Sequence, residues 1–406
     1  MGQSVLLAIE EQKKILLDNV KVIGTEQISL KDAAGRVMAE DVIADADVPP
    51  FDRSPYDGYA LRSEDVKNAS HEQPAVLEVL EEIPAGGISH FPVTNGTAVR
   101  IMTGAPIPEG ADCIIMYERT EFTETQVKVF DRVKAGENIV KKGEDVSKGT
   151  VLAKAGSVID AGLLATLAGQ NEASPRVYKV PRIGIITTGS ELTDVGEKLE
   201  NGMIYDSNRY TLIGTIKKNG CEPVVYGIAG DEIDTIAGKI IQAADECDMV
   251  LLTGGVSAGD FDYTPAAMEK AGAKIFFRGA RIKPGMACAY GGLKGRLICA
   301  LSGNPSSSIV NFLVLAYPAL RKLRGLSQYE PEEIEVTLKG GFGKASKGTR
   351  YLFGKLDLSD GTVRMDLASA QGNVIISSSI GCNVMAVVPA GSGPLEPGTK
   401  IKAFII

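Results

Sequence analysis

Residues 180–326 alternate between two kinds of segment, and this alternation limits the possible folds more than any other feature of the chain. Compact apolar runs that fit strands occupy 182–187, 223–228, 249–253 and 296–301. Stretches with helical apolar spacing cover 208–218, 234–244, 264–270 and 306–323. Strands that alternate with helices form parallel sheets with helices on both faces. The sequence therefore predicts an α/β domain built on a doubly wound parallel sheet.

The segments on either side of this domain favour β structure. An amphipathic helix with apolar residues from Val5 to Val20 opens the chain, and Val- and Ile-rich runs separated by Gly and Pro turns follow within 75–142. Beyond 331 the alternation returns, and Asp360-Gly361 between two apolar runs is a strong hairpin signal. We expect three parts, namely a β-rich N-terminal region over 1–179, the α/β domain over 180–326, and a small β barrel or sandwich over 327–406.

Composition excludes several classes of function. The 406 residues include 43 Lys and Arg against 51 Asp and Glu, and this net charge of -8 provides no global field for nucleic acid or an anionic membrane. The six cysteines form no Cys-x-x-Cys pair and the histidines are His71 and His90 alone, which excludes zinc fingers and iron–sulfur clusters. No membrane-spanning apolar window or signal peptide is present. We expect a cytoplasmic protein that binds neither nucleic acid nor membranes.

The loops that follow the predicted strands are rich in Gly and Ser. In an open parallel sheet, ligands bind outside the carboxyl ends of the strands, and exposed backbone amides there can hold an anion. Any single loop of this kind is better explained as a turn or helix cap, but several at one sheet edge favour a phosphate or other anion site. The candidate substrate-binding residues are Thr188, Gly189, Ser190, Gly254, Gly255, Ser257, Gly303, Asn304, Pro305 and Ser306.

Four carboxylates, Glu191, Asp231, Asp260 and Asp262, belong to the same loops. Two like charges 4 Å apart repel by about 1 kcal/mol in water and about 4 kcal/mol at an effective dielectric constant of 20. Mg²⁺ relieves such repulsion because it bridges one or two carboxylates and a substrate phosphate. We therefore expect these four residues to be metal ligands.

Several residues in or near these loops can also be explained by ordinary structural roles. Asp231 precedes a predicted helix and could equally be its N-cap. Asp206 or Ser207 is expected to cap the helix over 208–218 for the same reason. Lys283, which precedes a Pro-Gly turn, could supply a point charge to an anion or could be an ordinary surface lysine.

Residues 255–259 match the Gly-x-Ser-x-Gly nucleophile elbow and follow a predicted strand. An α/β hydrolase requires a histidine after that serine, and neither histidine lies beyond His90. We therefore reject a hydrolase. Residue patterns alone lead to an α/β protein with a Mg²⁺-assisted anion or phosphate site.

Further motifs occur in order along nearly the whole chain. Singly they read as turns, and Asp57-Gly58 fits a hairpin tip. The motifs are the Asp-Gly-Tyr-Ala core within 54–60, Met-Thr-Gly-Ala at 102–105, Gly-Glu-Asp at 143–145, and the stretches 188–191, 254–264, 282–285 and 303–305. The ordered set strongly resembles the molybdopterin molybdenumtransferase family, called MoeA in bacteria, which includes the E domain of gephyrin and its plant counterparts.

The resemblance implies an enzyme that takes molybdopterin adenylate, inserts molybdate at the dithiolene and releases AMP in a Mg²⁺-dependent step. It implies a homodimer with its cleft between subunits and contact with the molybdopterin adenylyltransferase. It also implies an elongated scaffold over about 1–50 and 146–179, a β-rich insertion over about 51–145, and a C-terminal β barrel. The catalytic residues that it implies are Asp57, Thr103, Asp145, Glu191, Asp262 and Lys283.

Met286, Ser302 and Asn373 depart from the commoner bacterial pattern of the family. We interpret Met286 as tolerated, because the gephyrin branch has an apolar residue there. Ser302 and Asn373 leave open a tungstate-preferring insertase or a slower paralogue. Two other hypotheses are a non-catalytic scaffold that binds the pterin and a different Mg²⁺-dependent nucleotidyl or phosphoryl transferase.

Overall fold

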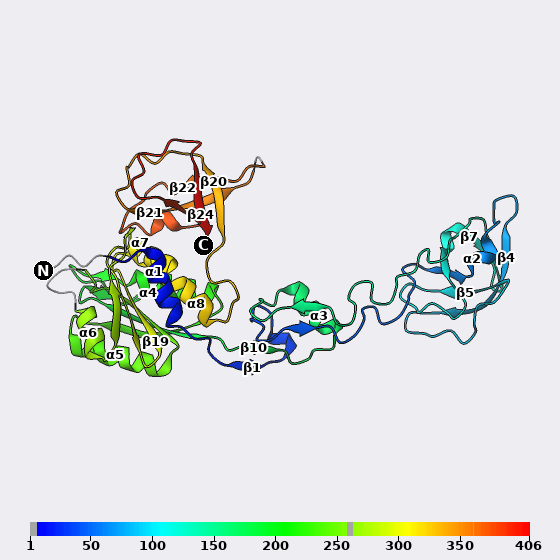
Figure 1. The fold of residues 1–406 in the computed structure, drawn as a ribbon, viewed down its shortest axis with the longest axis horizontal. Coiled ribbons are helices and arrows are strands. Elements are labelled where there is room, and N and C mark those ends of the chain that lie inside the picture. Colours follow the sequence, from blue (N-terminus) through cyan, green and yellow to red (C-terminus); the bar gives the residue numbers. More distant parts are fainter. Residues whose placement is uncertain (1–5, 258–262, 360) are drawn as a thin grey trace. The chain divides into compact units, whose positions relative to one another are not determined.

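The computed structural model describes residues 6–257, 263–359 and 361–406. The chain divides into two compact units, which are drawn in Figure 1. The first unit contains Met1–Glu40, Ala155–Asp160 and Ser174–Ile406, and the second contains Asp41–Lys154 and Ala161–Ala173.

A six-stranded sheet in the order β14-β11-β15-β19-β18-β16 forms the centre of the first unit. Its parallel strands are β11 (Arg182–Thr188), β14 (Glu222–Ala229), β15 (Met249–Thr253) and β19 (Arg296–Leu301). The doubly wound parallel sheet is therefore confirmed. Two antiparallel strands extend it, β16 (Lys274–Arg278) and β18 (Ala289–Leu293). The sequence analysis predicted neither of these strands, and in β18 the residues Gly291 and Gly292 weaken the strand signal.

Helices cover both faces of this sheet. Successive strand residues point to opposite sides, so each strand contributes side chains to a core on either face. Leu251 lies in the core on one face and Leu252 in the core on the other. The first core includes residues of α1 (Ile9–Asp18), α4 (Ser207–Lys218), α7 (Pro305–Asn311), the π-helical turn Phe312–Ala316 and α8 (Tyr317–Leu323). The second includes residues of α5 (Ile233–Glu246) and α6 (Thr264–Lys270), which Figure 1 shows on the opposite side from α1 and α8.

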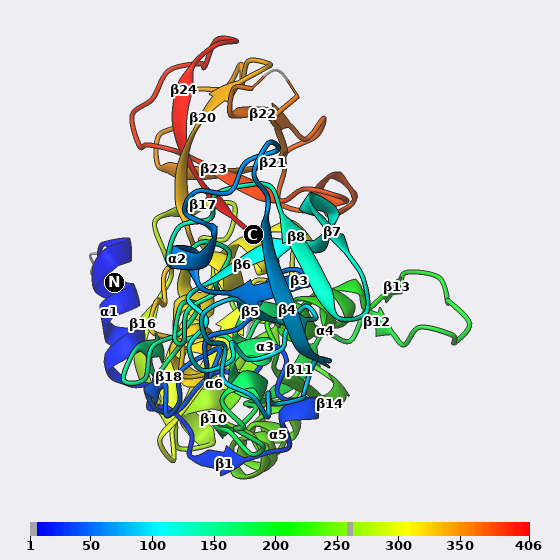
Figure 2. The same cartoon turned by 90° about the vertical axis from the view of Figure 1, so that its right-hand side faces the viewer.

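The C-terminal part of the first unit is a closed β barrel (Figure 2). It closes because β21 pairs with both β22 and β23. Its strands are β20 (Glu333–Leu338), β21 (Thr349–Asp357), β22 (Arg364–Leu367), β23 (Val384–Val388) and β24 (Lys400–Ile405), with a 3-10 turn at Ser377–Ser379. The predicted hairpin joins β21 to β22, although Asp360 lies outside the described residues. The short strand β17 (Ile282–Lys283) pairs with β21 and links the barrel to the α/β domain.

The first unit also contains a two-stranded antiparallel sheet near its N-terminal end. β1 (Thr25–Gln27) and β10 (Arg176–Tyr178) pair antiparallel, and a 3-10 turn lies at Leu30–Asp32. Within the part of the chain that the structure describes, no helix has both the length and the apolar character that crossing a membrane requires.

The second unit contains the expected β module, a six-stranded sheet in the order β6-β3-β5-β4-β8-β7. Two small apolar cores, one with Tyr59 and one with Ile101, stabilise it. Its strands are β3 (Gly58–Leu61), β4 (Ala75–Ile83), β5 (Thr97–Ile101), β6 (Cys113–Met116), β7 (Thr120–Phe122) and β8 (Gln126–Val129). The unit also contains α2 (Ser63–Val66), a 3-10 turn at Tyr117–Arg119, the strand pair β2 (Val42–Ile43) and β9 (Val151–Ala153), and α3 (Ala161–Gly169).

Candidate functional site

A cavity of about 600 Å³ lies at the carboxyl ends of the parallel strands, which is where an open α/β sheet binds ligands. We call it the strand-end cavity. The loops after all four parallel strands line it. The predicted residues among its lining are Thr188, Gly189, Glu191, Asp231, Gly254, Gly255, Ser257, Gly303, Asn304 and Pro305. Ser190 and Ser306 are not among the lining residues. The backbone N–H of Ser190 donates to Asp231, and Ser306 is buried in α7.

Two glycines allow the loop after β15 to pack against its neighbours. A Cβ atom at Gly254, whose φ is +100°, would lie 2.3 Å from the carbonyl oxygen of Thr188. At Gly255, whose φ is +63°, it would lie 2.6 Å from Oγ1 of Thr264. The Thr264 hydroxyl in turn donates a hydrogen bond of 2.9 Å to the Gly254 carbonyl. Only glycine fits this left-handed backbone at such close approach.

The Asp231 carboxylate is held by the neighbouring loop and does not cap a helix. Its Oδ2 accepts a 2.9 Å hydrogen bond from the backbone N–H of Ser190, and the backbone N–H of Asp231 donates to Oγ of Ser190 over 3.2 Å. The N-cap of α5 is Glu232. The N-cap interpretation of Asp231 was therefore wrong, because its carboxylate accepts from the backbone N–H of Ser190 and the N-cap of the helix lies one residue later.

Glu191 is exposed and lies over the turn that precedes it. A Cβ atom at Gly189 would be 2.5 Å from Oε2 of Glu191, so the carboxylate folds back onto the glycine. Among the described residues, no three His, Cys, Asp or Glu side chains gather closely enough to hold a metal ion. Asp260 and Asp262 lie outside the described residues. The predicted set of four ligands therefore stays a prediction.

The start of α4 forms part of the cavity wall. The Asp206 side chain is the N-cap of α4, as expected, and accepts from the backbone N–H of Arg209. Nδ2 of Asn208 donates a 2.7 Å hydrogen bond to the carbonyl of Gly303, which joins α4 to the loop after β19. Both residues line the strand-end cavity. Sequence reasoning treated Asp206 as a helix signal only, and it missed Asn208, Ile204 and Tyr205.

Lys283 lines a second cavity, of about 980 Å³. Ser257, Ser302 and Asn304 line both cavities. Lys283 is exposed at the end of β17, and Arg281 and Lys347 line the same cavity. Three basic side chains and one carboxylate, that of Glu10, therefore line the second cavity, whereas Glu191, Asp206 and Asp231 line the strand-end cavity.

A buried asparagine supports the turn after Lys283. Nδ2 of Asn311, in α7, donates a 2.8 Å hydrogen bond to the carbonyl of Gly285, and the hydroxyl of Tyr290 donates to Oδ1 of Asn311.

The three residues that depart from the family pattern all line a cavity. Met286 and Asn373 line the second cavity, and Ser302 lines both.

Asp57 and Thr103 are adjacent in the second unit. Oδ1 of Asp57 accepts hydrogen bonds from the backbone N–H of Thr103 over 2.7 Å and from its hydroxyl over 2.9 Å. These bonds, the backbone one above all, lower the pKa of the Asp57 carboxyl below its usual value. Asp57 directly precedes β3, whose neighbours are β5 and β6, so the hairpin-tip interpretation was wrong. Asp145 is exposed in the same unit, and its backbone N–H donates to the carbonyl of Val48.

Comparison with known proteins identifies both halves of the chain. Residues 7–170 match the family described as MoeA N-terminal region (domain I and II), and residues 184–322 match the probable molybdopterin binding domain. A molybdopterin molybdenumtransferase of Staphylococcus epidermidis is 34% identical over 396 residues, 98% of this chain and 94% of that protein. One from Nostoc sp. is 35% identical over 384 residues, 93% of this chain and 88% of that protein.

The fold agrees with these sequence relationships. The crystal structure of the molybdopterin biosynthesis MoeA protein of Pyrococcus horikoshii superposes with a TM-score of 0.85 at 31% sequence identity, and the match covers 99% of this chain and all of that one. The relatives and the superposition cover nearly the whole chain, and the two matched family regions cover 7–170 and 184–322. The chain therefore belongs to the MoeA family of molybdopterin molybdenumtransferases.

Proposed function

We propose that the protein is a molybdenum insertase of molybdenum cofactor biosynthesis, which inserts molybdate into molybdopterin adenylate and releases AMP. The strand-end cavity carries this proposal, because four strand-end loops place glycine-rich backbone and carboxylates around about 600 Å³ in a chain whose relatives are named molybdopterin molybdenumtransferase. Cavities of roughly 300–1,000 Å³ hold small molecules of cofactor size.

The two cavities suit the two anionic parts of the reaction. The pyrophosphate linkage of the adenylate would lie by the loops after β11, β15 and β19, where amides can approach its oxygens. Molybdate is an oxyanion, and Lys283 would attract it from the second cavity, where Arg281 and Lys347 add positive charge. The shared lining of Ser257, Ser302 and Asn304 would let both substrates meet.

We assign Mg²⁺ to Glu191 and Asp231, together with Asp260 and Asp262 from the loop after β15. The donor set fits a hard cation, because Glu191 and Asp231 present carboxylate oxygens to one cavity. When bound, Mg²⁺ supplies positive charge to the phosphate oxygens as the bond to AMP breaks. Glu191, Asp231 and the glycine-rich loops orient the linkage, and the backbone N–H of Ser190 holds Asp231 in place.

Asp57, Thr103 and Asp145 belong to the second unit, and we propose that a homodimer brings them to the site. The carboxylate of Asp57 is fixed by two hydrogen bonds from Thr103, so it is positioned before any substrate binds. We further propose that the protein acts in the cytoplasm and receives its substrate by contact with the molybdopterin adenylyltransferase.

The proposal is tested by incubating the protein with molybdopterin adenylate, Mg²⁺ and molybdate. We expect AMP release that requires both the metal and the oxyanion. Release that is absent, or that matches a protein-free blank, would show that the protein is not an insertase. Pterin binding that ignores Mg²⁺ would favour the non-catalytic scaffold instead, and a bound ligand without a pterin would favour another transferase.

A preference for tungstate is the second candidate, because Ser302 and Asn373 lie at the cavities. The Ser302 side chain is buried between both cavities, and the carbonyl of Asn373 accepts a hydrogen bond of 3.2 Å from the backbone N–H of Ser307. Competition between equal concentrations of molybdate and tungstate, read as the metal bound in the product, separates the two candidates.

A further inference from the structure

A short segment after Glu191 forms one wall of the strand-end cavity, and we call residues 192–205 the ribbon. Its ends are β12 (Leu192–Thr193) and β13 (Ile204–Tyr205), which pair in parallel. Figure 2 shows the chain between them extending away from the sheet. Ile204 and Tyr205 line the cavity, and the backbone N–H of Ile204 donates a 2.9 Å hydrogen bond to the carbonyl of Glu191. The ribbon therefore both lines the cavity and anchors the backbone of Glu191.

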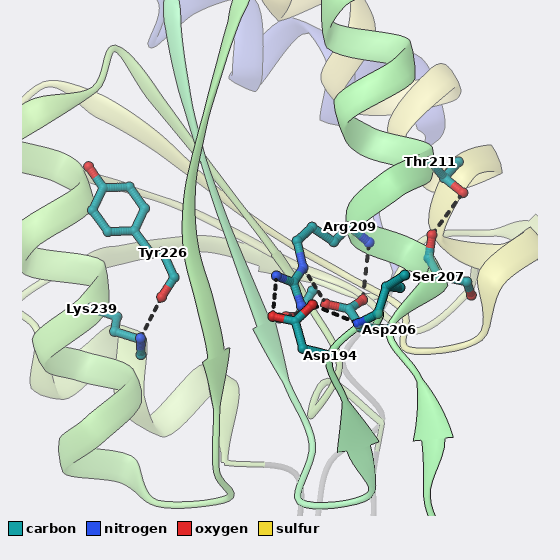
Figure 3. Close-up of polar contacts among 9 residues, drawn as sticks. Asp194, Asp206, Ser207, Arg209, Thr211, Tyr226 and Lys239 are labelled. Carbon is teal, nitrogen blue, oxygen red and sulfur yellow. Dashed lines mark hydrogen bonds and ion pairs between the residues drawn. The ribbon is translucent and has the colours of Figure 1, made fainter. Parts of the chain in front are cut away.

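Arg209 of α4 connects the ribbon to the domain core (Figure 3). Its Nη1 donates to Oδ2 of Asp194 over 3.0 Å, and its Nε donates to Oδ2 of Asp206 over 2.8 Å. The same oxygen of Asp206 accepts a 2.8 Å hydrogen bond from the hydroxyl of Thr187, in β11. One guanidinium thus links the ribbon, α4 and the strand that leads to Glu191. We call Asp194, Arg209 and Asp206 the clamp.

The two ends of the clamp differ in burial. The side chains of Arg209 and Asp206 are 8% and 1% exposed, whereas that of Asp194 is 41% exposed. The inner end therefore fixes the guanidinium, and the outer end tethers the ribbon. The hydrogen bond from Arg209 lowers the pKa of the Asp194 carboxyl, so this pair is ionised at neutral pH.

Stability alone does not explain a buried arginine here. Nη2 of Arg209 is buried and has no hydrogen-bond partner among the described residues. Leaving a buried donor unpaired is unfavourable, and well-packed apolar residues often replace buried ion pairs without loss of stability. What an apolar side chain could not provide is a directional link to two carboxylates at once.

We propose that Arg209 is a positioning residue, which acts through Asp194 and Asp206 to hold the ribbon, and with it Glu191 and Tyr205, against the substrate in the strand-end cavity. The existence of the clamp is independent of the reaction. The identity of the substrate rests on the proposed function.

The first test needs no substrate. Asp194→Ala removes the outer end of the clamp and leaves the buried Arg209–Asp206 pair and the N-cap intact. We expect backbone hydrogen exchange within 194–203 to accelerate by about 10-fold, as local opening becomes easier, with Tm unchanged within about 2 °C. Asp245→Ala, which removes an exposed ion pair with Lys294 in the same unit, is the control and should leave ribbon exchange unchanged. Unchanged ribbon exchange in D194A would overturn the clamp.

The second test measures AMP release. In D194A we expect KM for molybdopterin adenylate to rise about 10-fold with kcat within about twofold, because a loose ribbon binds substrate less well. Asp194→Glu keeps the carboxylate and should recover most of the loss. Arg209→Lys loses the planar fork that bridges both carboxylates and should resemble D194A. A normal KM despite faster ribbon exchange would overturn the positioning role. If the unsubstituted protein releases no AMP, the proposed function fails and the exchange measurement alone decides the clamp.

Discussion

Glu191 and Asp231 line the same cavity but are held differently. Asp231 accepts a hydrogen bond from the backbone N–H of Ser190, so its carboxylate also stabilises a loop. Glu191 is exposed, and its carboxylate rests against Gly189. Replacement by alanine should therefore affect activity alone at Glu191, and both activity and stability at Asp231.

Substitution of Glu191 should therefore separate activity from stability. We expect Glu191→Ala to lower kcat for AMP release by roughly 10²-fold or more, the usual scale for losing one preorganised electrostatic group, while Tm changes little. Asp231→Ala should also lose about 1 kcal/mol of stability, because the Ser190 amide loses its acceptor. Activity assays and thermal unfolding of both variants check this. Parallel losses of activity and stability in E191A would show that Glu191 is structural.

Glu81 provides a test by pH in the second unit. Burial raises the pKa of its carboxyl, but hydrogen bonds from the Ser89 hydroxyl, the His90 ring and the backbone N–H groups of His90 and Phe91 outweigh this and lower it to about 2. A depressed pKa in the folded state stabilises the protein above the unfolded value of 4.5. That contribution is lost as the pH falls from about 4.5 towards 2.

Urea unfolding of the protein and of Glu81→Gln between pH 5 and 2 checks this contribution. We expect the midpoint of the unsubstituted protein to fall more steeply with decreasing pH, because the neutral amide cannot titrate. Identical slopes for the two proteins would contradict the assignment.

Sequence patterns identified the cavity-lining residues that directly follow a parallel strand. They missed residues that line the cavity from other elements. Gly254 and Glu191 could be predicted because parallel strands end at one edge and their loops follow at once. Tyr205 could not, because a two-residue strand has no apolar pattern. Asn208 is the second residue of α4, where an amide side chain gives no sequence signal for a cavity. Its hydrogen bond to Gly303 depends on tertiary packing.

At the level of elements, the loop after β15 depends on glycine conformation. We expect Gly255→Ala to destabilise the protein by about 1–3 kcal/mol, because its φ of +63° disfavours a Cβ that would also meet Thr264. Gly238→Ala is the matched control, since Gly238 lies in α5 with nothing within 4 Å of the added Cβ, and it should stabilise by about 0.5–1 kcal/mol. Urea unfolding measures both. Equal stability of G255A and the unsubstituted protein would contradict the close approach.

Strong periodicity made the main elements predictable. α6 has the predicted bounds of 264–270, and β15 those of 249–253. The predicted helix over 306–323 is interrupted by the π-helical turn Phe312–Ala316, which apolar spacing does not reveal. Closure of the barrel depends on the pairing of β21 with β23, a contact between strands far apart in sequence.

At the level of the whole molecule, the net charge of -8 conceals a nearly neutral α/β segment, since residues 180–326 contain 16 basic and 15 acidic side chains. Local geometry can therefore hold a small anionic substrate there, as can the proposed Mg²⁺, although the total charge opposes a polyanion. Two basic residues of this segment, Arg281 and Lys283, line the second cavity.

The proposed dimer predicts complementation between inactive variants. Asp57→Ala alters the second unit and Glu191→Ala the first, so a mixed dimer whose sites form between subunits keeps one intact site. Mixed dimers isolated by two different affinity tags after co-expression should release AMP at about half the full rate, because one of their two sites is intact. Mixed dimers as inactive as either parent would show that each site forms within one chain.

The central claim is that the strand-end cavity supports insertion of molybdenum. The most direct test quantifies AMP and protein-bound molybdenum after a single turnover of molybdopterin adenylate. We predict that AMP and inserted molybdenum form in equal amounts, that neither forms when Mg²⁺ is removed, and that both form at least about 100-fold more slowly when Glu191 is replaced by Ala. Molybdenum insertion without AMP release, or no insertion at all by the unsubstituted protein, would contradict the account.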